Sequence, residues 1–195
     1  MGIIKPTKKQ IKSIQILDNF FTEEEYDKLL QLSKTLPYEP AANKESHFSM
    51  RCYFESTENK FNWINKKIKN TFLKGDNTTY YFLCYIFDQR HNKTQIKPHR
   101  DDSDWNFICY LSGQSLIYNG TGFWSKQINE NKDNCELNTY VGFQKNRAIF
   151  FNGRDTVHGD LQALGESSIR ITLSIFLYSD KKDCKQKEPL DWSIF

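Results

Sequence analysis

The most regular pattern in this chain is Ser168-Ile169-Arg170-Ile171-Thr172-Leu173-Ser174-Ile175-Phe176-Leu177-Tyr178. Aliphatic residues occupy every second position from Ile169 to Leu177, and polar or aromatic residues lie between them. Because successive side chains of a strand point to opposite faces, the pattern predicts a half-buried β-strand over 168–178. Arg170 shares its face with hydroxyl groups, and an arginine beside a hydroxyl can bind a carboxylate. For this strand alone, a solvent-facing polar side with a surface arginine is the alternative.

A second short motif, Pro98-His99-Arg100-Asp101, lies upstream of that strand. In an extended strand His99 and Asp101 point the same way, whereas Asp102 points to the opposite face. His158, in Val157-His158-Gly159, can supply a second imidazole. Two histidines and one carboxylate leave positions open on a metal, and this set suits non-haem Fe(II) in oxygenases. A His-x-Asp triplet alone also arises by chance, but here a distal histidine and an arginine-bearing strand follow it in order.

In this order, His99-x-Asp101, His158 and Arg170 resemble the Fe(II)/2-oxoglutarate-dependent oxygenases, on the prolyl-hydroxylase-like side of that superfamily. The segment 108–112 resembles the family's strand after the His-x-Asp motif, whose tyrosine matches Tyr110 here and reaches the distal carboxylate of 2-oxoglutarate. Residues 14–25 resemble the family's first strand and first helix. The resemblance spans roughly residues 13–178, nearly the whole chain.

The resemblance implies a mainly β fold with some α structure: a double-stranded β-helix, or jelly-roll barrel, over about 78–178, supported by N-terminal helices. It implies one dioxygenase domain over 1–195, with His99, Asp101 and His158 as the catalytic ligands of Fe(II). Its cosubstrates are 2-oxoglutarate and O2, and ascorbate is a further candidate cofactor. The residues expected to bind 2-oxoglutarate are Arg170, Tyr110, Ser174, Thr172 and Tyr85. Halogenating relatives carry Gly or Ala in place of the ligating carboxylate, so Asp101 favours a hydroxylase.

Two helices and several strands are expected along the chain. Thr22-Glu23-Glu24-Glu25 is typical of a capping box that opens a helix, which Pro37 would end. A second helix is expected from about Thr57 to Leu73, with Gly75 as its stop. Apolar residues expected on its buried face are Phe61, Ile64, Ile68 and Phe72. The strand ranges expected besides 168–178 are 79–87, one ending at His99, 105–111, 115–118, 138–143 and 147–151.

Composition and charge narrow the class of protein. The 195 residues are enough for one domain with a sizeable core. The 27 basic and 24 acidic residues give a net charge of +3, too small to argue for a nucleic-acid or membrane partner. Five scattered cysteines without a Cys-x-x-Cys pair argue against a structural zinc site and a disulfide framework. We expect a soluble, cytoplasmic protein, because no membrane span or signal peptide is recognisable.

The substrate is less constrained by the sequence. Candidate substrate contacts are Arg51, Arg100 and Trp124, although each can equally be a surface charge or a core aromatic. The resemblance favours hydroxylation of a prolyl or other amino-acid residue in a peptide, or of a free amino acid. Alkylation-repair demethylases of nucleic acids carry a second arginine six residues after the first, where this chain has Phe176. The non-enzyme alternative is a jelly-roll binding module with a vestigial metal site.

Overall fold

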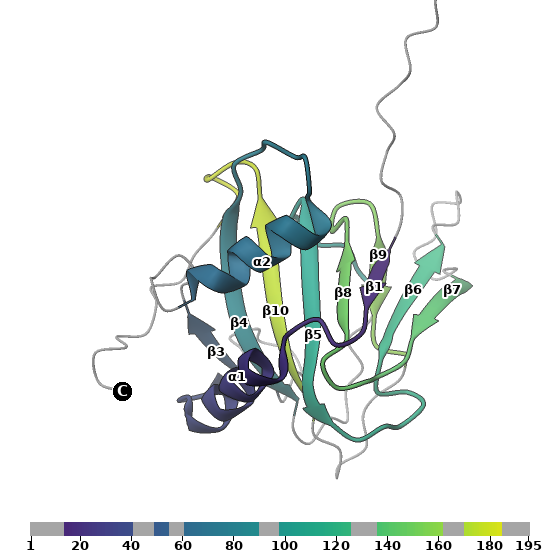
Figure 1. Ribbon diagram of the computed structural model, residues 1–195. Helices are drawn as coiled ribbons and strands as arrows, with labels where there is room; N and C mark the ends of the chain where they lie inside the picture. Colours follow the sequence, from purple (N-terminus) through teal and green to yellow (C-terminus); the bar gives the residue numbers. More distant parts are fainter. Residues whose placement is uncertain are drawn as a thin grey trace, which may run out of the picture.

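The computed structural model describes residues 14–40, 49–54, 61–89, 98–125, 136–161 and 170–184. These segments contain two helices and ten strands (Figure 1). In chain order the elements are β1 (Gln15–Leu17), α1 (Glu23–Thr35), β2 (Glu39–Pro40), β3 (Ser49–Phe54), α2 (Asn62–Phe72), β4 (Tyr81–Gln89), β5 (Trp105–Gly113), β6 (Thr121–Ser125), β7 (Glu136–Val141), β8 (Ala148–Phe151), β9 (Val157–Gly159) and β10 (Arg170–Tyr178).

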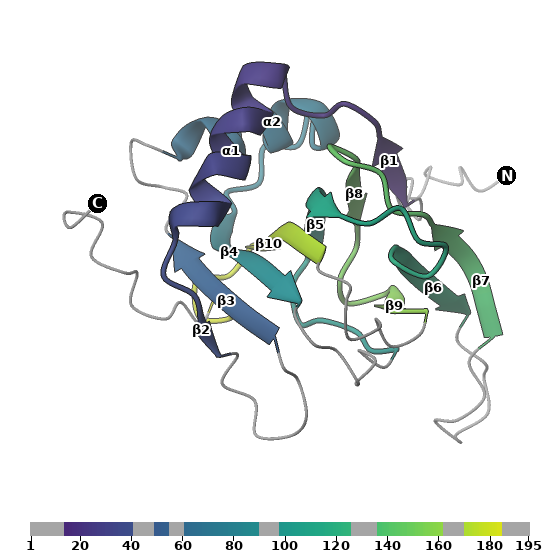
Figure 2. The same ribbon diagram turned by 90° about the horizontal axis from the view of Figure 1, so that it is seen from below.

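The strands form two antiparallel sheets that lie face to face. The larger sheet has the order β1-β8-β5-β10-β4-β3-β2, and the smaller has the order β7-β6-β9. Seen from below, the smaller sheet lies on the opposite side of the larger one from α1 and α2 (Figure 2). The chain therefore has a mainly β jelly-roll architecture backed by helices, which confirms the predicted double-stranded β-helix.

Strand β10 runs through the middle of the larger sheet, between β5 and β4. Its aliphatic residues Leu173, Ile175 and Leu177 are fully buried in the core cluster that also contains helix residues. Its other face carries Arg170 and hydroxyl-bearing residues, and these are buried as well. The polar face of this strand is therefore part of the protein interior, and the surface-arginine alternative is wrong.

Strands β5 and β8 alternate in the same way and so separate two apolar cores. Phe107 and Phe150 face the helices, and Phe150 stacks on Phe72 of α2 with ring centroids 4.8 Å apart. Tyr110 and Phe151 belong to the second cluster, which the smaller sheet completes. The first core supports the larger sheet from behind, while the second fixes the distance between the two sheets.

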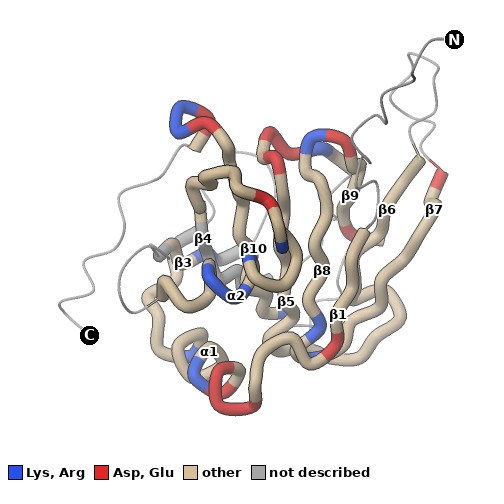
Figure 3. The backbone as a smooth tube through the Cα atoms, turned by 45° about the horizontal axis from the view of Figure 1, so that its top comes forward, with Lys and Arg blue, Asp and Glu red and all other residues tan. Residues whose placement is uncertain are grey.

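The helices follow their sequence patterns closely. Thr22 Oγ accepts the backbone N–H of Glu25 at 3.3 Å, and the Glu25 carboxylate accepts the N–H of Thr22 at 2.9 Å, which confirms the capping box. Lys67 of α2 forms an ion pair with Glu25 and so joins the two helices. Figure 3 shows acidic residues at the start of α1 and basic residues along α2. No helix in the described segments is long and apolar enough to cross a membrane.

Several expected element boundaries differ from the structure. The strand expected over 115–118 is wrong, because Asn119 N–H bonds the carbonyl of Leu116 at 3.0 Å and closes a turn there. The second helix begins at Asn62, and residues 57–60 of its expected start lie outside the described residues. The strand expected to end at His99 falls on 90–97, also outside them, and His99 itself forms only an isolated bridge. Strands β6 and β9 were not expected.

Asn146 connects the N-terminal segment to the sheet. Its Oδ1 accepts the N–H of Phe21 at 2.9 Å and its Nδ2 donates to the Phe21 carbonyl at 2.8 Å. Its backbone N–H bonds the carbonyl of Tyr110 at 2.8 Å. Asn146 has a φ of 60°, which asparagine tolerates better than most residues other than glycine. One residue thus ties the start of α1 to β5.

We predict that Asn146→Ala destabilises the fold by about 2–4 kcal/mol, from two lost hydrogen bonds and the cost of a positive φ. Asn146→Gly removes the same hydrogen bonds without that cost, so it should destabilise by about 1–2 kcal/mol. Urea unfolding of both variants measures the difference. Equal losses in the two variants would show that backbone conformation plays no part.

Candidate metal and carboxylate site

A backbone bridge brings the two candidate histidines together. His99 N–H donates to the carbonyl of His158 at 2.9 Å, and His158 N–H donates to the carbonyl of His99 at 2.9 Å. His158 lies on β9, which pairs with β6 of the smaller sheet. The two histidines have 58 residues between them in the chain. Their imidazole rings nevertheless have centroids only 4.5 Å apart. The bridge therefore fixes one side of a three-residue cluster.

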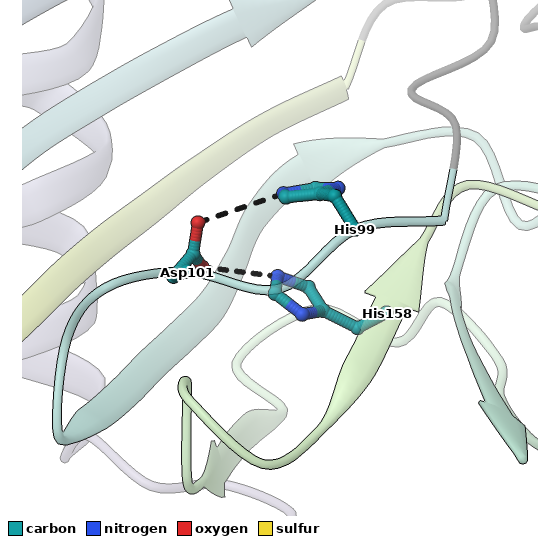
Figure 4. Close-up of side chains that lie close together, drawn as sticks. All are labelled: His99, Asp101 and His158. Atoms are coloured by element: carbon teal, nitrogen blue, oxygen red, sulfur yellow. Dashed lines mark ion pairs between the residues drawn. The ribbon is translucent and has the colours of Figure 1, made fainter. Parts of the chain in front are cut away.

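Asp101 completes the cluster (Figure 4). Its Oδ2 lies 3.2 Å from His158 Nε2 and its Oδ1 lies 3.6 Å from His99 Nε2. One ligand atom from each of the three residues lies within 4.8 Å of the others. Two ligands at right angles around a metal with bonds of about 2.1 Å are about 3 Å apart, close to the shortest of these separations. The sequence prediction that these residues converge on one site is thus met by the geometry.

The ring of His158 turns its Nδ1 toward a backbone carbonyl and its Nε2 toward Asp101. His158 Nδ1 lies 3.2 Å from the carbonyl of Thr156, which can only accept a hydrogen bond. A neutral imidazole donating there presents the lone pair of Nε2 to the Asp101 carboxylate. With Nε2 free of hydrogen, a divalent cation between Nε2 and the Asp101 carboxylate would satisfy both acceptors. This donor set, two imidazoles and a carboxylate, fits Fe(II) with positions left open.

A set of neighbours holds Asp101 in place. Asn106 of β5 donates from Nδ2 to Asp101 Oδ2 and accepts the hydroxyl of Ser103 at Oδ1. The backbone N–H of Asp101 bonds the carbonyl of Gly153 at 3.2 Å. Burial raises the pKa of the Asp101 carboxyl, but the hydrogen bond and charge of His158, with His99 and Asn106, outweigh it. The net pKa lies below the ordinary value, so Asp101 stays ionised as a ligand must.

Gly153 is needed for this support to fit. A Cβ at position 153 would lie 2.5 Å from Ser103 Oγ, 2.7 Å from the Ser103 carbonyl and 2.8 Å from Asn106 Oδ1. Any larger residue would therefore push on the pair that orients Asp101. The Asn152-Gly153 turn thus helps to position a metal ligand.

Exposure across the cluster is graded. The side chain of His158 is 8% exposed, that of Asp101 is 19% exposed and that of His99 is 42% exposed. Solvent therefore reaches the cluster from the side of His99. A substrate would approach a bound metal from that side.

Arg170, the first residue of β10, belongs to a second polar group. Its side chain is buried, its Nη1 donates to the carbonyls of Gly120 at 2.9 Å and Asn119 at 3.4 Å, and its Nε has no hydrogen-bond partner among the described residues. Burial lowers the pKa of Arg170. The charges of Asp160 and Tyr110 raise it by more, so the net pKa lies above the ordinary value. A buried N–H without a partner costs about 1–3 kcal/mol, so this nitrogen favours an incoming acceptor such as a carboxylate.

Asp160 already forms an ion pair with this arginine. Asp160 Oδ1 lies 2.8 Å from Arg170 Nη2, and both side chains are buried. Asp160 follows His158 by two positions, at the end of β9. Neither Asp160 nor Asn106 was among the residues predicted for the site. Alternation from His158 could have indicated the first, and alternation from Tyr110 along β5 could have indicated the second.

Of the other residues expected to bind 2-oxoglutarate, Tyr110 interacts electrostatically with Arg170, and Thr172 and Ser174 follow Arg170 along the same strand. Tyr110 is fully buried, burial raises the pKa of its hydroxyl, and its Oη lies 2.7 Å from Thr121 Oγ1. Thr172, opposite Tyr110 in the β5–β10 register, and Ser174 are buried on the Arg170 face. Tyr85 lies on β4 opposite Ser174, and its side chain falls outside the described part of the structure.

The three expected substrate contacts are dispersed. Arg100 is exposed beside the metal ligands, and Arg51, on β3, donates from Nη1 to Tyr53 Oη at 3.3 Å. The ring of Trp124 lies over Gly122, where a Cβ would come within 2.5 Å of it. These three roles stay predictions, and Arg100 is the one placed next to the cluster.

The fold is similar to those of several solved 2-oxoglutarate oxygenases. A prolyl hydroxylase from Trichoplax adhaerens, in complex with a hypoxia inducible factor peptide fragment, matches with a TM-score of 0.64 and 13% identity, over 91% of this chain and 89% of that one. HygX from Streptomyces hygroscopicus, with nickel and 2-oxoglutarate bound, matches with a TM-score of 0.60 and 9% identity, over 85% and 83%. A Pseudomonas putida prolyl-4-hydroxylase matches with a TM-score of 0.57 and 9% identity, over 86% and 93%.

Sequence comparisons add nothing to this likeness. No family model matches the chain, and no curated protein matches it. At such low identities the structural likeness shows the fold. The chemistry must therefore be argued from the residues of this site.

We predict that His99→Ala and His158→Ala each lower Mn(II) affinity by more than about 100-fold, because each removes one of three ligands. Substituting a residue that only supports a ligand typically lowers metal affinity by about 10–100-fold, so losing a ligand should cost more. Calorimetric titration with Mn(II) measures the loss. Asp102→Ala is the matched control, because Asp102 is exposed and, in the described part of the chain, its carboxylate accepts a hydrogen bond from the Tyr178 hydroxyl at 3.2 Å. Full Mn(II) affinity in either histidine variant would refute the assignment.

Gly153→Ala should lower Mn(II) affinity by about tenfold or more, because the added methyl group displaces Ser103 and Asn106. The control is Gly142→Ala, since a Cβ at position 142 meets nothing within 4 Å. The same titration compares the two. Identical Mn(II) affinities of the two variants would mean that the space around Gly153 does not affect the position of Asp101.

Proposed function

We propose that this chain is an Fe(II)- and 2-oxoglutarate-dependent oxygenase that hydroxylates a C–H bond of an amino-acid residue, prolyl or other, in a peptide or in a free amino acid. The single observation that carries the proposal is the placement of two complementary groups along β9. His158 belongs to a His-Asp-His cluster, and two positions later Asp160 contacts a buried arginine with an unpartnered Nε. Such an arrangement suits a metal at one end of a short oxo-acid and a cation at the other.

The scale of the arrangement supports a short oxo-acid. His158 lies on β9 and Asp160 directly follows that strand, and two residues of extended chain span at most roughly 6.6 Å, twice the rise of about 3.3 Å. A metal site and an arginine spaced on that scale suit a ligand with a metal-chelating end and a distal carboxylate. In this protein His99, Asp101 and His158 would hold Fe(II), and Arg170 with Tyr110 would hold the distal carboxylate of 2-oxoglutarate.

The protein's own contribution is orientation and the exclusion of water. When bound, Fe(II), 2-oxoglutarate and O2 supply the oxidising chemistry and yield succinate, CO2 and a hydroxylated product. Asn106 holds the Asp101 carboxylate, the Gly153 carbonyl accepts the backbone N–H of Asp101, and the Thr156 carbonyl contacts the ring of His158. The apolar cluster around Phe151, whose ring lies 4.7 Å from that of His158, shields the inner side of the ligands.

A peptide or amino-acid substrate is supported by the open side of the cluster and by the structural neighbours. His99 is the exposed ligand and Arg100 beside it is exposed. A peptide segment can approach across such a surface, and one neighbour is a prolyl hydroxylase described with a peptide. The presence of Phe176 where alkylation-repair enzymes carry a second arginine disfavours a nucleic-acid demethylase.

The test is succinate formation from 2-oxoglutarate in the presence of Fe(II) and ascorbate, with candidate peptides and amino acids screened for the gain of one oxygen atom. Asp101→Ala should lower turnover by about 100-fold or more, because it removes a metal ligand. Asp102→Ala, one position away and with the same loss of charge, should retain most of it. A binding module without catalysis would form no succinate with either variant or with the unmodified protein. If Asp102→Ala alone lost turnover, the assignment of Asp101 to the site would be wrong.

A further inference from the structure

The pair between Asp160 and Arg170 has a consequence for the choice of cosubstrate. Arg170 Nη2 and Asp160 Oδ1 are 2.8 Å apart, with side chains 6% and 4% exposed. The arginine that would receive the cosubstrate's carboxylate therefore already has a carboxylate of this chain beside it. A buried pair of this kind is neutral as a unit.

The donors of Arg170 are largely in use. A guanidinium has five N–H groups. Nη1 faces two carbonyls of the Asn119-Gly120 turn and Nη2 faces Asp160, whereas Nε finds no partner among the described residues. An incoming carboxylate can thus gain the Nε–H, but it must share the rest of the guanidinium with Asp160.

The negative charge of Asp160 also disfavours a second carboxylate at Arg170. A second carboxylate at Arg170 would lie near the Asp160 carboxylate, in an interior where like charges repel more strongly than in water. An oxo-acid with an uncharged tail would meet no such repulsion. The carboxylate of Asp160 must therefore offset part of the attraction that Arg170 offers to a dicarboxylate.

We propose that Asp160 is a specificity-determining residue that weakens the preference of this site for a distal carboxylate, so that 2-oxo acids with uncharged tails bind nearly as well as 2-oxoglutarate. This inference rests on the proposed function, since it concerns the cosubstrate of the same site. It assigns a role to a residue that contacts Arg170 and is not a metal ligand.

The experiment compares two 2-oxo acids of equal chain length, 2-oxoglutarate and 2-oxopentanoate. Calorimetric titration into Mn(II)-loaded protein measures binding without turnover. In the unmodified protein the two dissociation constants should differ by less than about tenfold, the change that 1.4 kcal/mol produces. In Asp160→Asn, which keeps size and hydrogen bonding but removes the charge, 2-oxoglutarate should bind at least about tenfold more tightly, while 2-oxopentanoate changes little.

The matched control is Asp155→Asn, an exposed carboxylate of the preceding turn. It makes the same charge change at a residue whose backbone N–H donates to Asn152 Oδ1 at 2.9 Å, and both dissociation constants should stay as they are. Thermal unfolding provides a second readout. Asp160→Asn leaves Arg170 without its counter-charge and should melt lower, and 2-oxoglutarate should raise its melting temperature more than that of the unmodified protein.

The outcomes separate the two proposals. A preference for 2-oxoglutarate above about 100-fold in the unmodified protein overturns the inference, even if the variant does not fold. So does weaker or unchanged 2-oxoglutarate binding in a folded Asp160→Asn, which would make Asp160 a residue that only positions Arg170. In both cases the proposed function survives, because the oxo-acids bind. If neither oxo-acid binds the Mn(II)-loaded protein, the proposed function itself fails, and the inference fails with it.

Discussion

The paired backbone hydrogen bonds between His99 and His158 are the constraint on which this site depends. They join a segment just before β5 of the larger sheet to β9 of the smaller sheet. Because β9 is held in turn by β6, the separation of the two sheets fixes the separation of the two imidazoles. The apolar cluster between the sheets, with Tyr110 and Phe151 in it, therefore supports the metal ligands as well as the fold.

Strand β9 links the two halves of the site. His158 takes part in the metal cluster, and Asp160 contacts the arginine of β10. The polar face of β10 is buried, and Arg170 on it contacts Asp160, which follows β9, and the Asn119-Gly120 turn, which precedes β6. Burial makes the charge of Arg170 effective, and it also makes the charge of Asp160 effective against a second anion.

Local patterns predicted much of this protein. Alternation along β10 indicated both its apolar face and the position of Arg170, and the capping box located the start of α1. Strand β9 has three residues and β6 has five, too few for periodicity to reveal, and their pairing is a tertiary property. Asn106 shares the alternation of Tyr110 along β5, whereas the fit of Gly153 against Ser103 and Asn106 depends on contacts between distant segments, which no local pattern could predict. Asp160 was within reach, since it shares the alternation of His158.

The central proposal is that one site binds a metal and an oxo-acid together. The effect of each ligand on the affinity for the other tests this most directly. The dissociation constant of 2-oxoglutarate should be about tenfold lower or more with saturating Mn(II) than without it. A chelating ligand that binds the metal and the protein together loses the bonds to the metal when the metal is absent. By the same linkage, 2-oxoglutarate should tighten Mn(II) binding by an equal factor. Affinities for 2-oxoglutarate that are equal with and without the metal would contradict a shared site.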